Sequence, residues 1–572
     1  MKNLLIILSC FLFSLSTSAQ NRIRGVVKNE NGRRLPKVLV YQSSGQVSSY
    51  TDSDGRFEIY TPYSEDTLSF SLDNYQTAKL VLNVSDYHDI SLKQNLPNNK
   101  ALTSFSSRDQ SLDAILLYGG ETYSSLVENP EVSTEQSKSV SFTVNTNRAA
   151  YSNIRRFINM DSRVPSDAVR IEEMLNYFNF NYTDPAENEL FRQSSVIAEC
   201  PWNETHKLMF VSVAAKTLDF KNVPPSNFVF LLDVSGSMDL PNRLPLIKSG
   251  IRLLVKNLRN IDTVSLVTYG KSIDIVFEGL SGSKKDSISK AVENLVADGN
   301  TPGEAGLKLA YKVAIRKFMK TGNNRIILAT DGDFNVGVSS EKELEKLIVQ
   351  EGNTGIQLTC LGVGMGNYKD SKLYLLAQKG HGNFSYLDNE KEAEKVLVTE
   401  FTQTLFTVAE DVYLSLTFDS SVVREFRLIG YDNKRSALED TASELEGGEI
   451  GSGHSLLVMF ELAMRESISE AQTVANLTIH YQMPGRSFKL EKTYNCLYNV
   501  KPFRLLDPDL KKATNIAMLG MKLKNSVYSK PISWPFIEKY AKQVFNKKIP
   551  MEAQYLELIN KARKIYKRNV ND

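Results

Sequence analysis

Five side chains with oxygen donors lie at the ends of apolar runs, or at the start of a loop, near the centre of the chain. They are Asp233, Ser235, Ser237, Thr301 and Asp331. The first three follow residues 228–232 and the last follows residues 325–330, and both stretches are apolar enough to be buried strands. In a doubly wound sheet, ligands bind beyond the carboxyl ends of the strands, where the strand order reverses. If the two strands are neighbours, the five side chains meet in one crevice.

This donor set predicts a divalent-cation site. It has two carboxylates and three hydroxyls, and no histidine or cysteine. Hard oxygen donors favour Mg²⁺, Mn²⁺ or Ca²⁺ over Zn²⁺, and Mg²⁺ is the ion we expect first. If the carboxylates act mainly through water, the ion keeps an open position that prefers an anionic ligand. We expect this ligand to be a carboxylate of a protein partner, and we expect Asp233 to face a solvent crevice and not the core.

The elements that must position these residues follow from an alternation of strand and helix patterns between residues 225 and 400. Apolar strands alternating with amphipathic helices predict an α/β domain with a parallel, doubly wound, Rossmann-like sheet. The expected strands are 228–232, 264–269, 273–277, 325–330, 356–362 and 383–387, and the expected helices are 244–258, 284–295, 303–318, 342–350 and 371–378.

The order D-x-S-x-S, a distant threonine and a distant Asp-Gly resembles the metal-ion-dependent adhesion site of von Willebrand factor A-type domains. Other stretches resemble a bacterial exported subfamily in which this domain lies between a characteristic N-terminal region and a characteristic C-terminal domain; they include residues 168–178, 200–203, 329–337, 364–370, 427–431 and 448–454. The resemblance implies a cation on the five residues. The fold alone does not decide the biochemical role, and the function that we expect first is a binding or adhesion-type protein. One departure is that Asn145 and Asn147 stand where the resemblance predicts acidic residues.

Residues 20–95 contain short apolar stretches separated by turns, which predicts an N-terminal β-sandwich. The expected strands are 23–27, 38–42, 57–60, 68–72 and 79–82. The patterns I-x-G-x-V, L-P-x-V and T-D-x-D-G-x-F resemble the carboxypeptidase-regulatory-like β-sandwich. Asp52 and Asp54 lie within the third pattern, and we interpret them as turn residues and not as calcium ligands.

The rest of the chain divides by composition. Residues 96–138 are mostly polar and predict a linker. Residues 139–224 form the N-terminal flanking region of the A-type domain at 225–400, with helices expected near 153–158 and at 166–177, the latter capped by Ser166 or Asp167. Residues 401–500 predict a β-rich C-terminal domain, and residues 501–572 predict helices at 508–523, 533–545 and 552–566.

The first nineteen residues predict export. Lys2 precedes a mostly apolar run from Leu4 to Leu15, and small residues follow up to Ala19, which is the pattern of a secretory signal cleaved after Ala19. The alternative is a lipid attached to Cys10. No later stretch reaches the ~18 apolar residues that span a bilayer, so we expect no transmembrane segment in the mature chain. We predict a protein of the periplasm, cell envelope or cell surface of a bacterium.

The charge balance argues against a nucleic-acid partner, and the cysteine spacing argues against a metal site built on cysteines. The chain has 68 basic and 66 acidic residues spread along its length, which argues against nucleic acid as a partner. Without Cys10, the remaining cysteines are Cys200, Cys360 and Cys496, and no two of them have metal-ligand spacing. Cys200 and Cys496 can form a disulfide in an oxidising compartment, which the sequence alone does not decide.

Two other functions remain as alternatives to a binding protein. One is a structural scaffold of an envelope complex, in which the metal only stabilises its loop. The other is a metal-dependent hydrolase, which the sequence disfavours. A phosphate-transferring site needs an aspartate where Ser235 stands, and a nucleophile elbow needs glycines where Asp233 and Ser237 stand. None of the five histidines has an obvious partner, so we predict that the protein is not an enzyme.

Overall fold

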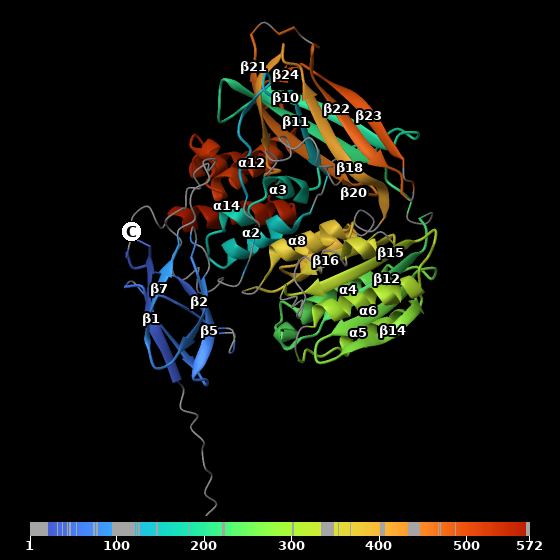
Figure 1. Cartoon of the computed structure of the whole chain (residues 1–572). Coiled ribbons are helices and arrows are strands. Elements are labelled where there is room, and N and C mark those ends of the chain that lie inside the picture. Colours follow the sequence, from blue (N-terminus) through green and yellow to red (C-terminus); the bar gives the residue numbers. More distant parts are fainter. Residues whose placement is uncertain are drawn as a thin grey trace, which may run out of the picture. The chain divides into compact units, whose positions relative to one another are not determined.

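The computed structural model places the chain in two compact units, Met1–Asp109 and Gln110–Asp572, which are described separately (Figure 1). It describes residues 21–93 and 121–567 except for 31, 37, 43, 45–46, 53, 73–74, 76–77, 122, 124–125, 145–146, 181, 220–222, 300–301, 333–347, 353, 366–367, 401–405, 433–446, 467, 470, 485 and 487. The expected signal at 1–19, with Cys10, lies outside the described residues. None of the helices in the described part of the chain is both long and apolar enough to cross a bilayer.

The smaller unit is a β-sandwich, as predicted. One sheet has the order β4-β1-β7 and the other the order β3-β2-β5-β6. The strands are β1 (Asn21–Asn29), β2 (Leu39–Gln42), β3 (Val47–Tyr50), β4 (Arg56–Thr61), β5 (Glu65–Ser71), β6 (Ala78–Asn83) and β7 (Tyr87–Leu92). Phe57 and Phe70 meet between the sheets with ring centroids 5.0 Å apart. Asp52 accepts hydrogen bonds from the backbone N–H of Asp54 and Arg56, so it acts as a turn residue.

The central sheet of the larger unit has the order β14-β13-β12-β15-β16-β17. Its strands are β12 (Ser226–Asp233), β13 (Thr263–Tyr269), β14 (Ile273–Ser281), β15 (Asn323–Thr330), β16 (Ile356–Gly362) and β17 (Phe384–Tyr386). All neighbouring pairs are parallel except β13 and β14, so the prediction of a parallel doubly wound sheet is confirmed except at this edge strand. The two directions of winding start from β12, which puts the reversal of strand order between β12 and β15.

Helices cover both faces of this sheet because successive side chains of β12 point to opposite sides. Phe228, Phe230 and Leu232 pack with α4 (Leu244–Lys256) and α5 (Lys285–Glu293). Val229 and Leu231 pack with α6 (Gly303–Arg316) and α8 (Asp370–Lys379). A strand that is buried on both faces needs a continuous run of apolar residues, and this run is why the strand could be predicted from the sequence.

Segments before and after the central domain share a second β-sandwich. One sheet has the order β24-β10-β11-β21-β19-β8; the other has β20-β18-β22-β23, with β9 paired to β18. The strands are β8 (Val132–Ser133), β9 (Ser139–Thr143), β10 (Phe191–Glu199), β11 (His206–Ala215), β18 (Thr407–Phe418), β19 (Val423–Ile429), β20 (Gly448–Gly451), β21 (Ser455–Met464), β22 (Thr473–Gln482), β23 (Lys489–Leu497) and β24 (Val500–Lys501). The two flanking regions, which the sequence analysis separates, are therefore one structure.

The predicted linker extends too far at its C-terminal end. Val132–Ser133 pairs with β19, and the side-chain amide of Asn129 donates to the backbone oxygens of Gly430 and Tyr431. Asn129 looks like a linker residue in the sequence, because its hydrogen-bond partners are backbone groups just after β19, 301 and 302 positions later in the chain.

A helical layer packs against the first of these sheets, with the C-terminal helices shown in red in Figure 1. It consists of α2 (Ala149–Asn159), α3 (Ile171–Tyr177), α12 (Pro508–Leu523), α13 (Trp534–Val544) and α14 (Pro550–Lys567). The predicted cap of the second helix is wrong: α3 begins after Arg170, and Ser166–Ala168 is a separate 3₁₀ turn. Asp167 instead accepts a hydrogen bond from the backbone N–H of Leu126.

Three largely buried arginines of the N-terminal flanking region join the central domain to this framework. Arg148 pairs with Glu400, Arg170 pairs with Asp370, and Arg155 pairs with Asp388 and Glu392. In each case the arginine precedes β12 and the carboxylate belongs to the C-terminal half of the central domain. Charges buried in this way are tolerated only when they are paired, so the domain is fixed to its flanks and not loosely tethered.

The three described cysteines are buried and unpaired with one another. Cys200 packs with the helical layer, whereas Cys496 packs between the two sheets of the second sandwich. The structure therefore does not contain the Cys200–Cys496 disulfide that the sequence left open.

Candidate metal centre

Asp233 ends β12, and Asp331 directly follows its neighbour β15. The two strands are paired in parallel, with Leu232 opposite Ala329, so both carboxylates lie at the same edge of the sheet. This is also the edge where the strand order reverses, which is where doubly wound sheets bind their ligands.

Asp233 is buried, with 0% of its surface exposed, which corrects the expectation that it faces a solvent crevice. Its carboxylate accepts hydrogen bonds from the Ser235 backbone N–H at 2.9 Å, the Thr330 hydroxyl at 2.8 Å and the Tyr269 hydroxyl at 3.3 Å. Burial raises the pKa of Asp233 to about 6, although the bonds from Ser235 and Thr330 oppose this rise. A buried carboxylate with a raised pKa gains from a nearby positive charge.

The two serines of the motif lie side by side, with their hydroxyl oxygens 3.1 Å apart. Ser235 is buried and Ser237 is exposed, so this pair connects the buried carboxylate to the surface. The next loop packs against them, because Gly236 donates its N–H to the carbonyl of Gly299 at 2.9 Å. Thr301 lies just beyond that loop and outside the described residues, so its part in the site stays a prediction.

Arg243 was not foreseen as part of this centre. Its guanidinium pairs with the carboxylate of Asp331 and also donates to the carbonyls of Ser237, at 2.8 Å, and Met365, at 2.9 Å. Only 7% of Arg243 is exposed. The residue lies in the turn before α4, a position at which an arginine is ordinarily solvated, and no local pattern signals its contact with Asp331.

The residues that the structure describes fit a hard divalent cation. Two carboxylates and two hydroxyls come together, and the carboxylate of Asp233 is buried without a cationic side chain among its hydrogen-bond donors. All of these donors are oxygen atoms, the ligands that Mg²⁺ and Ca²⁺ prefer. The arrangement includes no histidine or cysteine, which would favour zinc.

A cavity of about 270 Å³ lies beside the centre. It is lined in part by Asn159 and Met160 of the N-terminal flanking region and by Asn242, Met365 and Tyr386 of the central domain. Asn242 adjoins Arg243, and the carbonyl of Met365 accepts from that arginine, so the cavity and the candidate metal centre share a wall.

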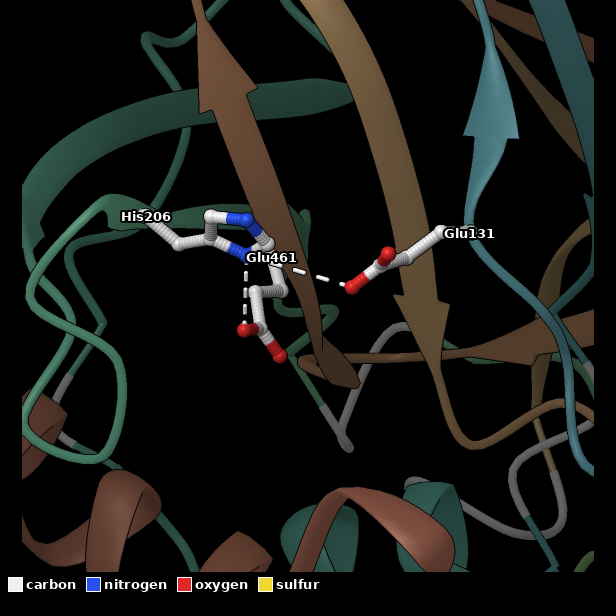
Figure 2. A group of neighbouring side chains, drawn as sticks. All are labelled: Glu131, His206 and Glu461. Carbon is white, nitrogen blue, oxygen red and sulfur yellow. Dashed lines mark hydrogen bonds and ion pairs between the residues drawn. The ribbon is translucent and has the colours of Figure 1, made fainter. Parts of the chain in front are cut away.

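A second group of ionisable residues lies in the second sandwich and consists of Glu131, His206 and Glu461 (Figure 2). The His206 Nδ1 is 2.9 Å from Glu461 and 4.0 Å from Glu131. Glu461 also accepts from buried Arg427 at 2.6 Å and from the indole N–H of Trp202 at 3.2 Å.

The surroundings of Glu461 argue for a structural network and not a second metal centre. Burial raises the pKa of Glu461, but the hydrogen bonds from His206, Arg427 and Trp202 outweigh it and lower the pKa to about 2. A carboxylate that already accepts from a guanidinium and two ring nitrogens has little capacity left for an ion. The partner of His206 could not be expected from the sequence, because His206 meets Glu461 only through the pairing of β11 with β21.

Comparison with known families identifies four segments. Residues 23–104 match the CarboxypepD_reg-like domain, residues 118–210 a family described as von Willebrand factor, residues 227–403 the von Willebrand factor type A domain, and residues 403–565 the C-terminal part of a protein described as uncharacterized protein YfbK. The two resemblances found in the sequence are confirmed by these matches.

Individual relatives and solved structures also match parts of the chain. Uncharacterized protein YfbK of Escherichia coli (strain K12) is 35% identical over 452 residues, which cover 74% of this chain and 78% of that protein. The magnesium-chelatase 67 kDa subunit of Chlorobaculum parvum is 25% identical over 233 residues, which cover 36% of this chain and 37% of that protein. Among solved structures, a von Willebrand factor type A protein from Catenulispora acidiphila matches with a TM-score of 0.38 and 13% identity, covering 63% of this chain and 88% of its own.

Proposed function

Because the chain belongs to the family of protein YfbK, in which a von Willebrand factor type A domain lies between two flanking segments, we propose that it is a metal-dependent binding protein. Its cation is held by Asp233, Ser235, Ser237, Thr301 and Asp331, and the bound ion captures a carboxylate of a protein partner. The observation that carries the proposal is the meeting of Asp233 and Asp331 at the ends of neighbouring strands. We propose Mg²⁺ as the ion, with Mn²⁺ and Ca²⁺ as alternatives, and the envelope of a bacterium as the location.

The exposed hydroxyl of Ser237 favours capture over a sealed structural site. A cation bound by both serines is accessible from the surface, where a partner can supply an anionic oxygen. The adjacent cavity offers a neutral second contact, because its two charged wall residues are already paired: Arg156 with Glu121, and Asp388 with Arg155. An uncharged side chain of the partner is the occupant that such a wall accepts at the lowest cost.

The test of the centre is titration calorimetry of the mature chain with Mn²⁺ and Mg²⁺. We expect one binding site. Asp233→Asn should abolish binding because the amide carries no negative charge, and asparagine is chosen because its shape is similar to that of aspartate. Asp239→Asn is the matched control, since Asp239 is an exposed aspartate two residues beyond Ser237 and outside the donor set. Unchanged binding in Asp233→Asn, or no binding of either ion to the wild-type chain, refutes the assignment.

The partner's role is tested by capture from envelope extract in Mg²⁺ against EDTA, with the Asp233→Asn chain in parallel. Once a partner is found, its acidic residues are replaced one at a time, and one replacement should remove most of the affinity. If EDTA leaves capture unchanged and no single carboxylate matters, the metal is structural. The paired arginines Arg148, Arg155 and Arg170, which fix the domain to its flanks, then favour the scaffold function.

A further inference from the structure

Arg243 places a permanent positive charge inside the candidate metal centre. Its guanidinium pairs with Asp331, one of the proposed ligands, and donates to the carbonyl of Ser237, the residue that carries another. An arginine stays protonated at any physiological pH, so this charge cannot be removed by losing a proton.

The surrounding backbone is shaped to hold this side chain. Gly364 has a positive φ of 76°, and a Cβ at that position would lie 2.6 Å from the Nε atom of Arg243. The carbonyl of the next residue, Met365, accepts from the same guanidinium at 2.9 Å. The arginine is therefore held from three sides by the loops after β12, β15 and β16.

The charges of the described groups determine what a cation meets on arrival. Asp233 and Asp331 contribute two negative charges and Arg243 one positive charge, which leaves a net charge of about −1 before binding and about +1 once a divalent ion is present. A buried or half-buried site with a net positive charge repels further cations and attracts an anion, since the interior screens these interactions poorly.

We propose that Arg243 is a built-in counter-ion that weakens the hold of the centre on a bare cation and thereby couples cation binding to the arrival of an anionic partner. In the absence of metal it neutralises Asp331. With metal bound it leaves an excess positive charge that the partner's carboxylate compensates. The inference rests on the proposed metal-binding function and adds to it a requirement for both ligands together.

A purely structural role is the competing explanation, in which Arg243 only ties three loops together. The two roles differ in what charge does. If Arg243 only holds the loops together, any substitution that removes its hydrogen bonds should be harmful. If Arg243 acts as a counter-ion, lysine keeps the positive charge and preserves the effect, whereas glutamine removes the charge and abolishes it. Removal of a counter-ion strengthens cation binding, and damage to a structural tie weakens it.

The experiment is Mn²⁺ titration calorimetry of the mature chain, comparing wild type with Arg243→Gln and Arg243→Lys. Arg252→Gln is the control, because it removes one positive charge from an exposed position on α4. We expect Arg243→Gln to bind Mn²⁺ at least tenfold more tightly than wild type, and Arg243→Lys and Arg252→Gln to stay within about threefold of it. Thermal denaturation of each variant without metal verifies that it is folded.

A second arm uses acetate as the carboxylate probe, with chloride at equal ionic strength as its control. Acetate should tighten Mn²⁺ binding to wild type severalfold and should have less effect on Arg243→Gln. Equal or weaker Mn²⁺ binding in folded Arg243→Gln, with wild type still binding the ion, overturns the counter-ion role and leaves the proposed function intact. Absence of Mn²⁺ binding in wild type and in every variant overturns the proposed function itself.

Discussion

At the scale of single residues, Arg155 connects distant parts of the larger unit. Its guanidinium bonds to Asp388 at 2.8 Å and Glu392 at 2.7 Å in the central domain, to the hydroxyl of Tyr177 at 3.0 Å and to Gln554 of α14 at 3.1 Å. One side chain thus connects the central domain, the N-terminal flanking region and the C-terminal helices.

Arg155→Ala should lower the free energy of unfolding of the larger unit by about 3–5 kcal/mol, because it leaves two buried carboxylates without their cation. Arg316→Ala is the control: its pair with Glu278 is largely exposed, and its loss should cost only about 0–1 kcal/mol. Urea denaturation of both variants provides the comparison, and equal losses would contradict the role given to Arg155.

His206 should make stability depend on pH. The hydrogen bond to Glu461 is the main cause of the raised pKa of His206. A histidine with a raised pKa stabilises the fold fully below its unfolded pKa of about 6.5, and this contribution is lost as the pH rises through the folded pKa. The melting temperature of wild type minus that of His206→Asn should therefore be larger near pH 6 than near pH 8.5.

His480→Asn is the matched control for this measurement, because burial lowers the pKa of His480. Its neutral form is favoured in the fold, so the wild-type histidine destabilises the protein increasingly as the pH falls through about 6.5. The melting-temperature difference for His480→Asn should move with pH in the opposite direction. The same direction of change for both variants would argue against the His206–Glu461 bond.

At the scale of elements, the glycine after Asp331 positions the candidate metal centre. Gly332 has a positive φ of 93°, and a Cβ there would lie 2.5 Å from the backbone nitrogen of Lys369. Two backbone segments, the end of β15 and the start of α8, thus pass each other at a distance that only glycine allows. The Asp-Gly pair of the motif has a steric reason as well as a chemical one.

Gly332→Ala should therefore be more destabilising than Gly355→Ala. Both positions have a positive φ and carry the strain of about 1 kcal/mol that a side chain has in this region. A Cβ at Gly355 would meet only the ring of Phe318 at 3.7 Å, an ordinary contact, whereas at Gly332 backbone must move. Urea denaturation of the two variants is the measurement. Similar losses of unfolding free energy would show that the backbone around Gly332 adjusts to the added Cβ without a further energetic cost.

The sequence predicts the elements of the central domain well and those of the flanking sandwich less well. The strand ending at Asp233 and the helix after Pro508 are found within a few residues, because their apolar periodicity depends only on local sequence. β10 was not predicted, since five of its nine residues are polar and its burial depends on partners elsewhere in the chain. β11 was not predicted either, although most of its residues are apolar. β3 has only four residues, two of them serines, and was not predicted either.

The same limit applies to the candidate metal centre. Asp233 and Asp331 could be brought together from sequence because each follows an apolar strand of a known type of sheet. The pairing of Arg243 with Asp331 could not, because 88 positions separate the two residues and an arginine in a turn is normally solvated. The position of a residue at the carboxyl end of a strand predicts which metal ligands come together, but it does not predict that Arg243 neutralises one of them.

At the scale of the whole molecule, the central domain is anchored on more than one side. Besides the three arginine pairs, buried Arg325 of β15 is attracted to Glu449 of β20, and Gln357 of β16 donates to the hydroxyl of Thr407. A fragment containing residues 225–400 alone would expose Asp370, Asp388 and Glu400 without their arginines. Binding measured on such a fragment would report on a differently charged protein.

Charge complementarity across this junction predicts its response to reversal. Arg170→Glu should destabilise the larger unit strongly, because it brings a second negative charge to Asp370. The double variant Arg170→Glu with Asp370→Arg should recover part of that loss if the pair acts mainly through charge. Differential scanning calorimetry of the single and double variants tests this, and a double variant no better than the single one would mean that geometry, not charge, dominates.

The sheet shared by β11 and β21 also has a consequence for how the chain is made. His206 lies opposite Ala463, which is 257 positions later in the chain, so residues 226–386 of the central sheet are synthesised before the strand that pairs with β11. During that interval β11 presents an open edge, the kind of surface that recruits strands from other chains.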